Sequence, residues 1–211
     1  MAQEHNDSLR EEHITRVEAY DPRQLRLLTY SKPTDYPSDG HLLSLGNMSG
    51  RFHFESLGRI WRSVEHLYLC GEWSTQGERS LEIQQDVLTA RSGYAAKRYK
   101  KAKYKREIRA DFPVFRHQWM LWCVWEKCLG NQDFRQHLTS IPYDRVLIEE
   151  VKNDPVWAAY PDEAGILRGA NGMGKILTIC RRCIDRNTEP NIDRTLLNQY
   201  EIHIMGARVT F

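Results

Sequence analysis

The sequence lacks any long hydrophobic run. No stretch of about 18 apolar residues occurs in its 211 residues, so we expect no membrane span and no membrane partner. Residues 1–10 are polar and lack the apolar centre of a secretory signal peptide. Internal repeats and low-complexity tracts are also absent. These absences predict a globular, cytoplasmic protein.

Cysteine is scarce, with five residues in the chain. An odd number favours a reducing compartment over a framework of disulfide bonds. Cys180 and Cys183 form a C-x-x-C pair, which occurs in redox sites and as half of a zinc site. Both residues also follow the helical spacing of apolar residues over 173–184, so we interpret them as buried helix residues. We expect neither a metal ion nor a cofactor.

Acidic residues are nearly absent from residues 91–109. This segment has nine basic residues and one acidic residue, Glu107, whereas the whole chain has a net charge of +2. A local concentration of positive charge attracts phosphate groups or a nucleic-acid backbone. The alternative is a solvated helix face. Nucleic acid is therefore one candidate partner, through the basic segment 91–109.

The composition that is present is ordinary for a globular protein, with 41% hydrophobic and 27% charged residues. Residues 1–18 are polar and predict a loosely held arm. Residues 19–211 are long enough to form one domain with a sizeable core.

Residue periodicity predicts a compact, mostly helical α+β fold with a few short strands. Apolar spacing predicts helices at 63–73, 80–91, 93–106, 112–129, 133–138, 172–186 and 194–199. Alternation and turn residues predict strands at 25–30 and 145–149, a hairpin at 52–61, a loop at 31–40, and a strand or surface segment at 202–211.

Four motifs occur in a fixed order along the chain. They are W-x-S-V-E-H-x-Y at Trp61–Tyr68, L-I-E at Leu147–Glu149, N-D-x-x-W at Asn153–Trp157, and G-x-N-x-M-G-K at Gly169–Lys175. In this order and with these spacings they resemble the NADAR family, and the resemblance covers about residues 30–184. It implies a compact α+β domain and an N-glycosidase activity.

Glu65 and Asp154 are the candidate catalytic residues. Cleaving a base from a ribose creates positive charge at C1′, and a nearby carboxylate stabilises that charge or activates the attacking water. Taken locally, Glu65 is also a typical first-turn glutamate that the helix dipole favours. Asp154 before Pro155 is also a typical helix or turn cap. The family resemblance places both on motif positions and implies a role at the reacting sugar.

The candidate ligand-binding residues are aromatic, polar and glycine residues around the same motifs. Rings can stack on a base or simply pack in the core. Glycines before a helix let a backbone approach a ligand, and the helix N-terminus offers N–H groups to phosphate. Asn171 can bond the ligand or lock its loop, whereas His66 is more typical of a structural hydrogen bond. The full set is Tyr30, Asn47, Trp61, His66, Lys97, Glu149, Trp157, Gly169, Asn171, Gly174 and Lys175.

The sequence departs from the family at one position. Many members have a lysine seven residues after the motif glutamate, where this chain has Glu72. If the family lysine contacts substrate, this protein has altered specificity, uses another lysine, or does not catalyse.

Three functions therefore stay open. The first is an N-glycosidase acting on an aminouracil ribotide of the riboflavin pathway or on ADP-ribosylated guanine. The second is a non-catalytic module that binds ADP-ribose or a nucleotide. The third is a nucleic-acid-binding protein acting through the basic segment.

Overall fold

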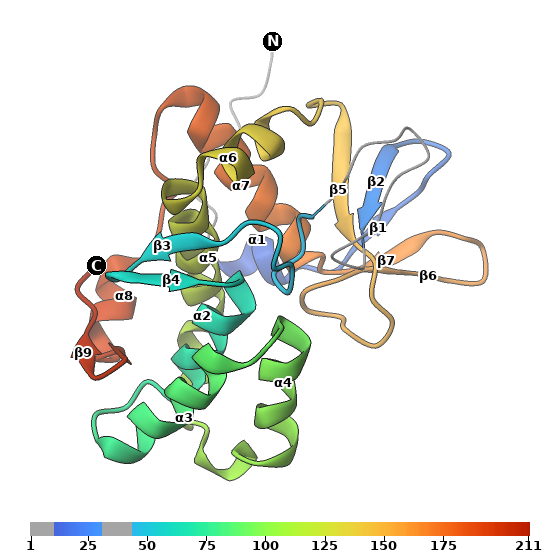
Figure 1. Cartoon of the computed structure of the whole chain (residues 1–211). Coiled ribbons are helices and arrows are strands. Elements are labelled where there is room, and N and C mark those ends of the chain that lie inside the picture. Colours follow the sequence, from blue (N-terminus) through green and yellow to red (C-terminus); the bar gives the residue numbers. More distant parts are fainter. Residues whose placement is uncertain (1–10, 31–43) are drawn as a thin grey trace. The chain divides into compact units, whose positions relative to one another are not determined.

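The computed structural model describes residues 11–30 and 44–211 (Figure 1). The predicted loop at 31–40 and the first ten residues of the predicted arm lie outside the described residues. The chain groups into two compact units. Unit 1 comprises Met1–Gly46 and Asp133–Asn191, and unit 2 comprises Asn47–Gln132 and Ile192–Phe211.

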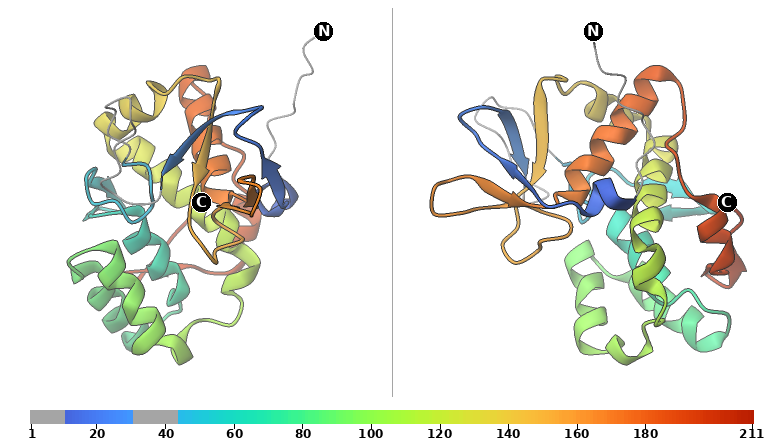
Figure 2. Two further views of the ribbon diagram at one scale, coloured as in Figure 1. Left: turned by 90° about the vertical axis from the view of Figure 1, so that its right-hand side faces the viewer. Right: turned by 180° about the vertical axis from the view of Figure 1, so that it is seen from behind.

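Unit 1 combines short strands with one long helix (Figure 2). Its elements are α1 Glu11–Thr15, β1 Glu18–Tyr20, β2 Arg26–Tyr30, β5 Arg145–Glu149, β6 Tyr160–Pro161, β7 Leu167–Gly169 and α7 Gly172–Arg186, with α6 Gln132–Thr139 beginning one residue before the unit. Strands β1, β7 and β6 form a three-stranded antiparallel sheet in that order. Strands β2 and β5 form a separate parallel pair.

The parallel pair aligns two segments that are far apart in the sequence. Arg26 pairs with Arg145 at one end and Tyr30 pairs with Glu149 at the other. Helix α7 packs closely against β5, because a Cβ atom on Gly174 would lie 2.1 Å from the carbonyl oxygen of Leu147. The carboxyl ends of two adjacent parallel strands therefore lie next to the start of α7, which is where α/β proteins usually bind ligands.

Unit 2 is mostly helical. Its elements are β3 Phe54–Ser56, β4 Arg59–Trp61, α2 Val64–Glu72, α3 Glu78–Thr89, α4 Gly93–Ala102, the 3₁₀ helix η1 Lys105–Glu107, α5 Phe112–Gly130, α8 Arg194–Gln199, β8 His203–Ile204 and β9 Ala207–Arg208. All nine residues of α2 are buried, and α2 contacts α3, α4 and α5. The specified residues of the W-x-S-V-E-H-x-Y motif thus lie in the interior, whereas Arg62, at its first variable position, is exposed.

The α+β class is confirmed. The hairpin turns at Gly58, whose φ of 67° suits glycine. Helix α4 ends at Ala102, earlier than predicted, and the chain continues as η1. In the predicted arm, Glu11–Thr15 is helical and Ile14 is fully buried. A single apolar residue among polar neighbours gives no periodic signal, so the sequence did not indicate this helix.

Several other features concern only the described residues. No helix there combines the length and the hydropathy that crossing a bilayer requires. Within the same ranges, no three His, Cys, Asp or Glu side chains form a group suited to a metal ion. All five cysteines are buried thiols, and Cys180 and Cys183 lie on α7 as interpreted from the sequence.

Candidate functional site

Glu65 is a buried carboxylate near the start of α2. Its residue is only 2% exposed. Asn47 holds it twice: the Asn47 carbonyl accepts the Glu65 backbone N–H at 2.8 Å, and the Asn47 side-chain amide donates to the Glu65 carboxylate. This double contact fixes the orientation of the carboxylate. Asn47, predicted as a ligand-binding residue, thus positions the candidate catalytic residue.

Glu72 lies on the same face of α2 as Glu65. Tyr68 lies between them, and the spacing of three and then four residues puts all three side chains on one side of the helix. Burial, then the charges of Glu72 and Glu65, raise the pKa of the Tyr68 phenol well above its usual value. Glu72, at the position where the resembled family often has a lysine, is therefore a second buried carboxylate, and its charge raises the Tyr68 pKa together with that of Glu65.

His66 and Trp61 have structural contacts. His66 Nε2 lies 3.1 Å from the carbonyl oxygen of Ala90, and Nδ1 lies 2.7 Å from the Ser63 hydroxyl. Burial lowers the His66 pKa, which favours a neutral ring with Nε2 protonated and donating to the carbonyl. Ser63 therefore bonds His66 instead of capping α2 with its side chain. The Trp61 indole is fully buried and donates to the carbonyl of Ser56 at 2.9 Å.

In unit 1, Tyr30 and Glu149 pair at the carboxyl ends of β2 and β5. The Glu150 N–H donates to the Tyr30 carbonyl at 2.9 Å and extends this pairing. Tyr30 is buried, and its hydroxyl has no hydrogen-bond partner in the part of the chain that the structure describes. Burial, with the charge of Glu149, raises the pKa of Tyr30 well above its usual value. Tyr30 therefore presents a neutral phenol beside Glu149.

Asn171 locks its loop against β5. It adopts a left-handed conformation with φ of 51° at the N-cap of α7. Its side-chain oxygen accepts the Glu149 N–H at 3.1 Å, and its side-chain amide donates to the Leu147 carbonyl at 2.8 Å. Of the two roles that the sequence left open, these contacts establish the lock. Asn171 thereby holds the strand end that carries Glu149.

Asp154 caps a turn that carries Trp157. The Asp154 carboxylate accepts the Trp157 N–H at 3.0 Å, and the Asp154 carbonyl accepts the Ala158 N–H at 3.1 Å. Residues 155–157 form a turn and not the first turn of a helix, contrary to one local interpretation. Asp154 and Trp157 are both half-buried. Capping uses one carboxylate oxygen, and a role in catalysis stays a prediction.

The start of α7 corrects one expectation. The N–H groups of Gly172 and Met173 donate to the carbonyls of Val156 and Trp157, each at 3.1 Å. These two groups are therefore not open to a phosphate, because the 154–158 turn already occupies them. Gly169, with φ of 155°, allows close packing, since a Cβ there would lie 2.2 Å from the Ala158 carbonyl oxygen. Close packing also explains the glycine at position 174, because a Cβ there would lie 2.1 Å from the Leu147 carbonyl oxygen.

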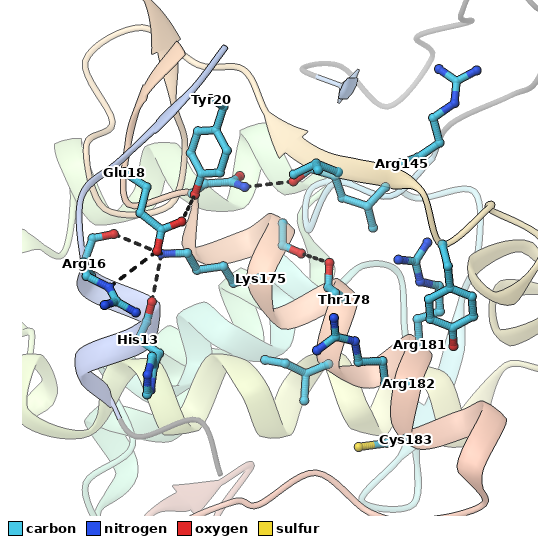
Figure 3. A pocket seen from close by; sticks show the side chains of 16 residues that line it. His13, Arg16, Glu18, Tyr20, Arg145, Lys175, Thr178, Arg181, Arg182 and Cys183 are labelled. Carbon is cyan, nitrogen blue, oxygen red and sulfur yellow. Dashed lines mark hydrogen bonds and ion pairs between the residues drawn. The ribbon is translucent and has the colours of Figure 1, made fainter. Parts of the chain in front are cut away.

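Lys175 anchors the segment between α1 and β1 (Figure 3). Its Nζ lies 2.8 Å and 2.9 Å from the carbonyl oxygens of His13 and Arg16, and 3.2 Å from the Glu18 carboxylate. An ammonium group has three N–H donors, so these contacts engage all of them. Its pairing with a phosphate stays a prediction, as does that of Lys97, which is half-buried on α4.

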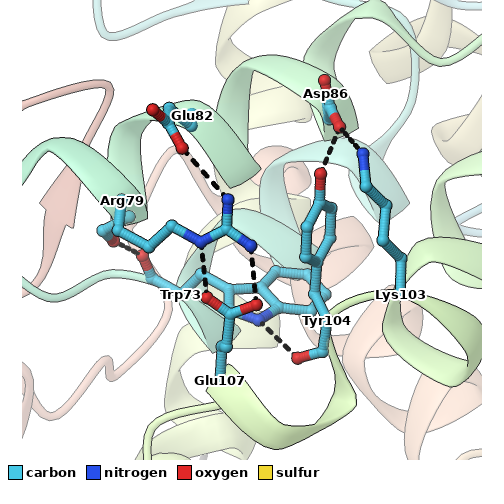
Figure 4. Close-up of polar contacts among 8 residues, drawn as sticks. Trp73, Arg79, Glu82, Asp86, Lys103, Tyr104 and Glu107 are labelled. Carbon is cyan, nitrogen blue, oxygen red and sulfur yellow. Dashed lines mark hydrogen bonds and ion pairs between the residues drawn. The ribbon is translucent and has the colours of Figure 1, made fainter.

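Part of the basic segment 91–109 is used inside unit 2 (Figure 4). Lys103 contacts Asp86 at 2.9 Å, and Glu107, the acidic residue of the segment, accepts two hydrogen bonds from Arg79. Arg109 donates to the Tyr200 carbonyl at 2.7 Å and also pairs with an aspartate. Lys103 and Arg109 therefore contribute less to an outward-facing charge than the sequence indicated.

The structure thus brings the predicted residues together in two sets. Unit 2 holds Asn47, Trp61, Glu65, His66 and Lys97. Unit 1 holds Tyr30, Glu149, Asp154, Trp157, Gly169, Asn171, Gly174 and Lys175. The buried cations Lys127 and Arg181 were not indicated by the sequence, because a single charged residue within an amphipathic helix is normally taken as exposed.

These elements define an α+β protein. No family model matches the sequence, and no curated protein matches it. Among solved structures, the NMR structure of the Escherichia coli protein YbiA matches with a TM-score of 0.58. The identity is 17%, over 77% of this chain and 88% of that chain. At this identity the match establishes the fold alone.

Proposed function

We propose that this protein is a cytoplasmic N-glycosidase that hydrolyses the bond between a phosphorylated ribose and a nitrogenous base. The observation that carries the proposal is Glu65, which is buried; its carboxylate accepts a hydrogen bond from the Asn47 side-chain amide, and its backbone N–H donates to the Asn47 carbonyl. A preorganised charge in a site shielded from water stabilises a transition state far more than the same charge in solution. The four sequence motifs and the NADAR-like fold support the reaction class.

In the proposed reaction, the bond between C1′ and the base nitrogen breaks and the electron pair leaves with the base. Water adds its oxygen to C1′, and its proton ends on the base. The ribose carries positive charge at C1′ in the transition state, which the Glu65 carboxylate stabilises. The family resemblance also predicts Asp154 as a second carboxylate and Trp157 as a ring for the base, and both of these residues belong to unit 1. No cofactor takes part in this chemistry.

The resemblance suggests two substrate groups. One is an aminouracil ribotide, and the other is ADP-ribose attached to guanine, free or within a nucleic acid. The side chains of Arg98, Lys105 and Arg106 are exposed, which supports attraction of a polynucleotide by the basic segment. We therefore favour the ADP-ribosylated guanine group.

Incubation of the full chain with these substrates, followed by mass spectrometry of released base and ribose, tests the proposal. Glu65→Gln keeps the shape and removes the charge, so kcat should fall by roughly 10²–10⁴-fold while KM changes little. Glu78→Gln is the matched control, because Glu78 lies in the first turn of α3 and is exposed. A Glu65→Gln variant with unchanged kcat would refute the catalytic role.

The second candidate function is binding of ADP-ribose without turnover. It is favoured by one observation, namely that the family's lysine position holds the buried carboxylate Glu72. Calorimetric binding of ADP-ribose together with no product from any substrate would establish it. If the Glu72→Lys variant then showed turnover, the lack of activity in the wild type would be due to Glu72.

Binding to plain duplex DNA would point to the third function. Neutralising Arg98, Lys105 and Arg106 should flatten the slope of log affinity against log salt by roughly 0.9 for each DNA phosphate that the variant no longer neutralises. Activity on a mononucleotide-sized substrate should not change in the same variant. An unchanged slope would indicate that the basic segment is a solvated helix face and does not bind DNA.

A further inference from the structure

The β3–β4 hairpin of unit 2 has an exposed aliphatic tip (Figure 1). Ser56 pairs with Arg59, so Leu57 and Gly58 form a two-residue turn between the strands. Leu57 is 41% exposed, and Ile60, on β4, is 69% exposed. Two aliphatic side chains at the outer end of the hairpin are therefore accessible to a partner.

Leu57 is an unusual residue for this turn. Leu57 and Gly58 have φ values of 53° and 67°, as both central residues of a type I′ turn must. Asparagine and glycine adopt positive φ readily, whereas a bulky side chain does so at a cost in free energy. The local fold therefore does not account for a leucine at position 57. A conformational cost of this kind is typical of a residue with a functional role.

A third exposed aliphatic side chain lies beside the hairpin. Leu129, near the end of α5, is 54% exposed. The next residue, Gly130, lies against β3, because a Cβ there would be 2.2 Å from the carbonyl oxygen of Glu55. Glu55 in turn pairs with Ile60. Leu129 therefore extends the apolar surface from the hairpin to the helix end that supports it.

Three arginines accompany these aliphatic residues. Arg51, Arg59 and Arg62 are exposed, and none of them forms an ion pair within residues 11–30 and 44–211. Between positions 51 and 62, three arginines and one glutamate, Glu55, give a net charge of +2 with histidine neutral. The hairpin thus combines an apolar tip with positive charge, which is complementary to an anionic partner that also has an apolar layer.

An anionic lipid surface has both properties. Arginine binds phosphate oxygens in a bidentate manner, and aliphatic side chains enter the boundary between head groups and acyl chains. A polynucleotide also offers phosphates, but single strands are bound largely by stacking of their bases on aromatic rings. The aromatic residues of this segment, Phe52, Phe54 and Trp61, are buried or half-buried. The exposed aliphatic side chains therefore favour lipid over nucleic acid.

We propose that the β3–β4 hairpin attaches this protein to the surface of a bilayer that contains anionic phospholipids. Leu57 and Ile60 enter the outer part of the bilayer, and Arg59 and Arg62 contact head-group phosphates. Binding at the interface uses a short apolar surface and requires no spanning segment. The attachment requires neither Glu65 nor Asp154, so it stands independently of the proposed glycosidase reaction.

Flotation of the full chain with lipid vesicles tests this surface. Vesicles of phosphatidylcholine with roughly one quarter phosphatidylserine should bind the wild type, and pure phosphatidylcholine should bind it at least about tenfold more weakly. The double variant Arg59→Gln/Arg62→Gln should weaken binding to the anionic vesicles by about 20–30-fold, since each arginine near such a surface contributes about fivefold. Arg186→Gln is the matched control, because Arg186 is an exposed arginine of unit 1. It should bind like the wild type.

Leu57→Asn separates the lipid contact from a loss of fold. Asparagine favours positive φ, so the melting temperature of this variant should equal or exceed that of the wild type. Its binding to anionic vesicles should nevertheless fall at least about fivefold, because an apolar side chain no longer leaves water. Val17→Asn is the matched control, since Val17 is a 67% exposed aliphatic residue of unit 1, and it should bind like the wild type.

A wild type that does not bind anionic vesicles would overturn the proposal. Wild-type affinity in Leu57→Asn or in the double arginine variant would also overturn it. Equal losses in Leu57→Asn and Val17→Asn would have the same consequence, because they would indicate that any exposed aliphatic residue contributes. If duplex DNA displaced the protein from the vesicles and Leu57→Asn weakened DNA binding equally, the hairpin would be a nucleic-acid contact and the assignment to lipid would be wrong.

Discussion

Replacing Lys127 by methionine should stabilise this protein at neutral pH. Lys127 lies on α5 with 1% of its surface exposed, and its Nζ lies 5.7 Å from the centre of the Phe52 ring. Burial lowers the Lys127 pKa from 10.5 to about 7. Each pKa unit corresponds to about 1.4 kcal/mol, so at pH 7 the shift costs the folded state about 4 kcal/mol. Contact with the Phe52 ring and the other interactions of Lys127 offset part of this cost. Lys127→Met should therefore raise the free energy of unfolding by about 1–3 kcal/mol.

The pH dependence of this gain separates a buried amine from a general packing effect. Between about pH 7 and 10.5, the unfolded state binds one more proton at Lys127 than the folded state. The stability of the wild type should therefore rise with pH by up to about 1.4 kcal/mol per unit relative to Lys127→Met. Urea unfolding at pH 7, 8, 9 and 10, followed by tryptophan fluorescence, measures the difference in free energy of unfolding between Lys127→Met and the wild type. This difference should decrease as the pH rises.

Lys105→Met is the control, because Lys105 is exposed on η1. It should change stability by less than about 0.5 kcal/mol at every pH. A gap between Lys127→Met and the wild type that stays constant from pH 7 to 10 would show that the buried amine keeps its proton, and would refute the reasoning.

Three further predictions concern packing, pH and the candidate site. Gly174→Ala should destabilise the fold by about 1–3 kcal/mol in thermal unfolding, because its Cβ would overlap a β5 carbonyl, whereas Gly46→Ala, with open space around it, should be nearly neutral. Burial lowers the His66 pKa, so the unfolded state binds more protons just below pH 6.5; stability should fall as pH drops through that range, and His66→Gln should remove this slope in urea unfolding. Trp157→Ala should weaken ligand binding by about 1–3 kcal/mol if the ring stacks on the base, and Asp154→Asn should lower kcat more than affinity. Unchanged activity per folded molecule in both variants would leave Asp154 as a turn cap.

The elements that the sequence predicted well are those with a strong local signal. Helix α7 begins at Gly172 and ends at Arg186 as predicted, because a long apolar stripe and a glycine-rich entry mark it. The hairpin turn at Gly58 is marked in the same local way. Strands β1, β6 and β7 were not predicted. They have two or three residues each, and β1 pairs with a strand about 150 residues further on, so no local period reveals them.

The candidate site residues also divide into those that a local motif indicates and those whose role depends on tertiary contacts. The choice of Glu65 as a candidate relied on a motif, and the structure adds its support by Asn47, which lies 18 residues away. The sequence could not decide between two roles for Asn171, because its partners are backbone atoms of β5, to which any residue type contributes. The charge of the basic segment was counted correctly, but its internal pairing to Asp86 depends on tertiary contacts.

The parallel pairing of β2 with β5 also affects how the chain folds during synthesis. The paired residues lie about 120 positions apart. At translation rates of 5–20 residues per second, β2 waits roughly 6–24 s before its partner strand has been made. Unit 1 extends to Asn191 and unit 2 needs residues from Ile192 onward, so neither unit can be complete before residue 191 has been synthesised. The nascent protein should therefore depend on chaperones for most of its synthesis, and no single cut in the chain separates the two units.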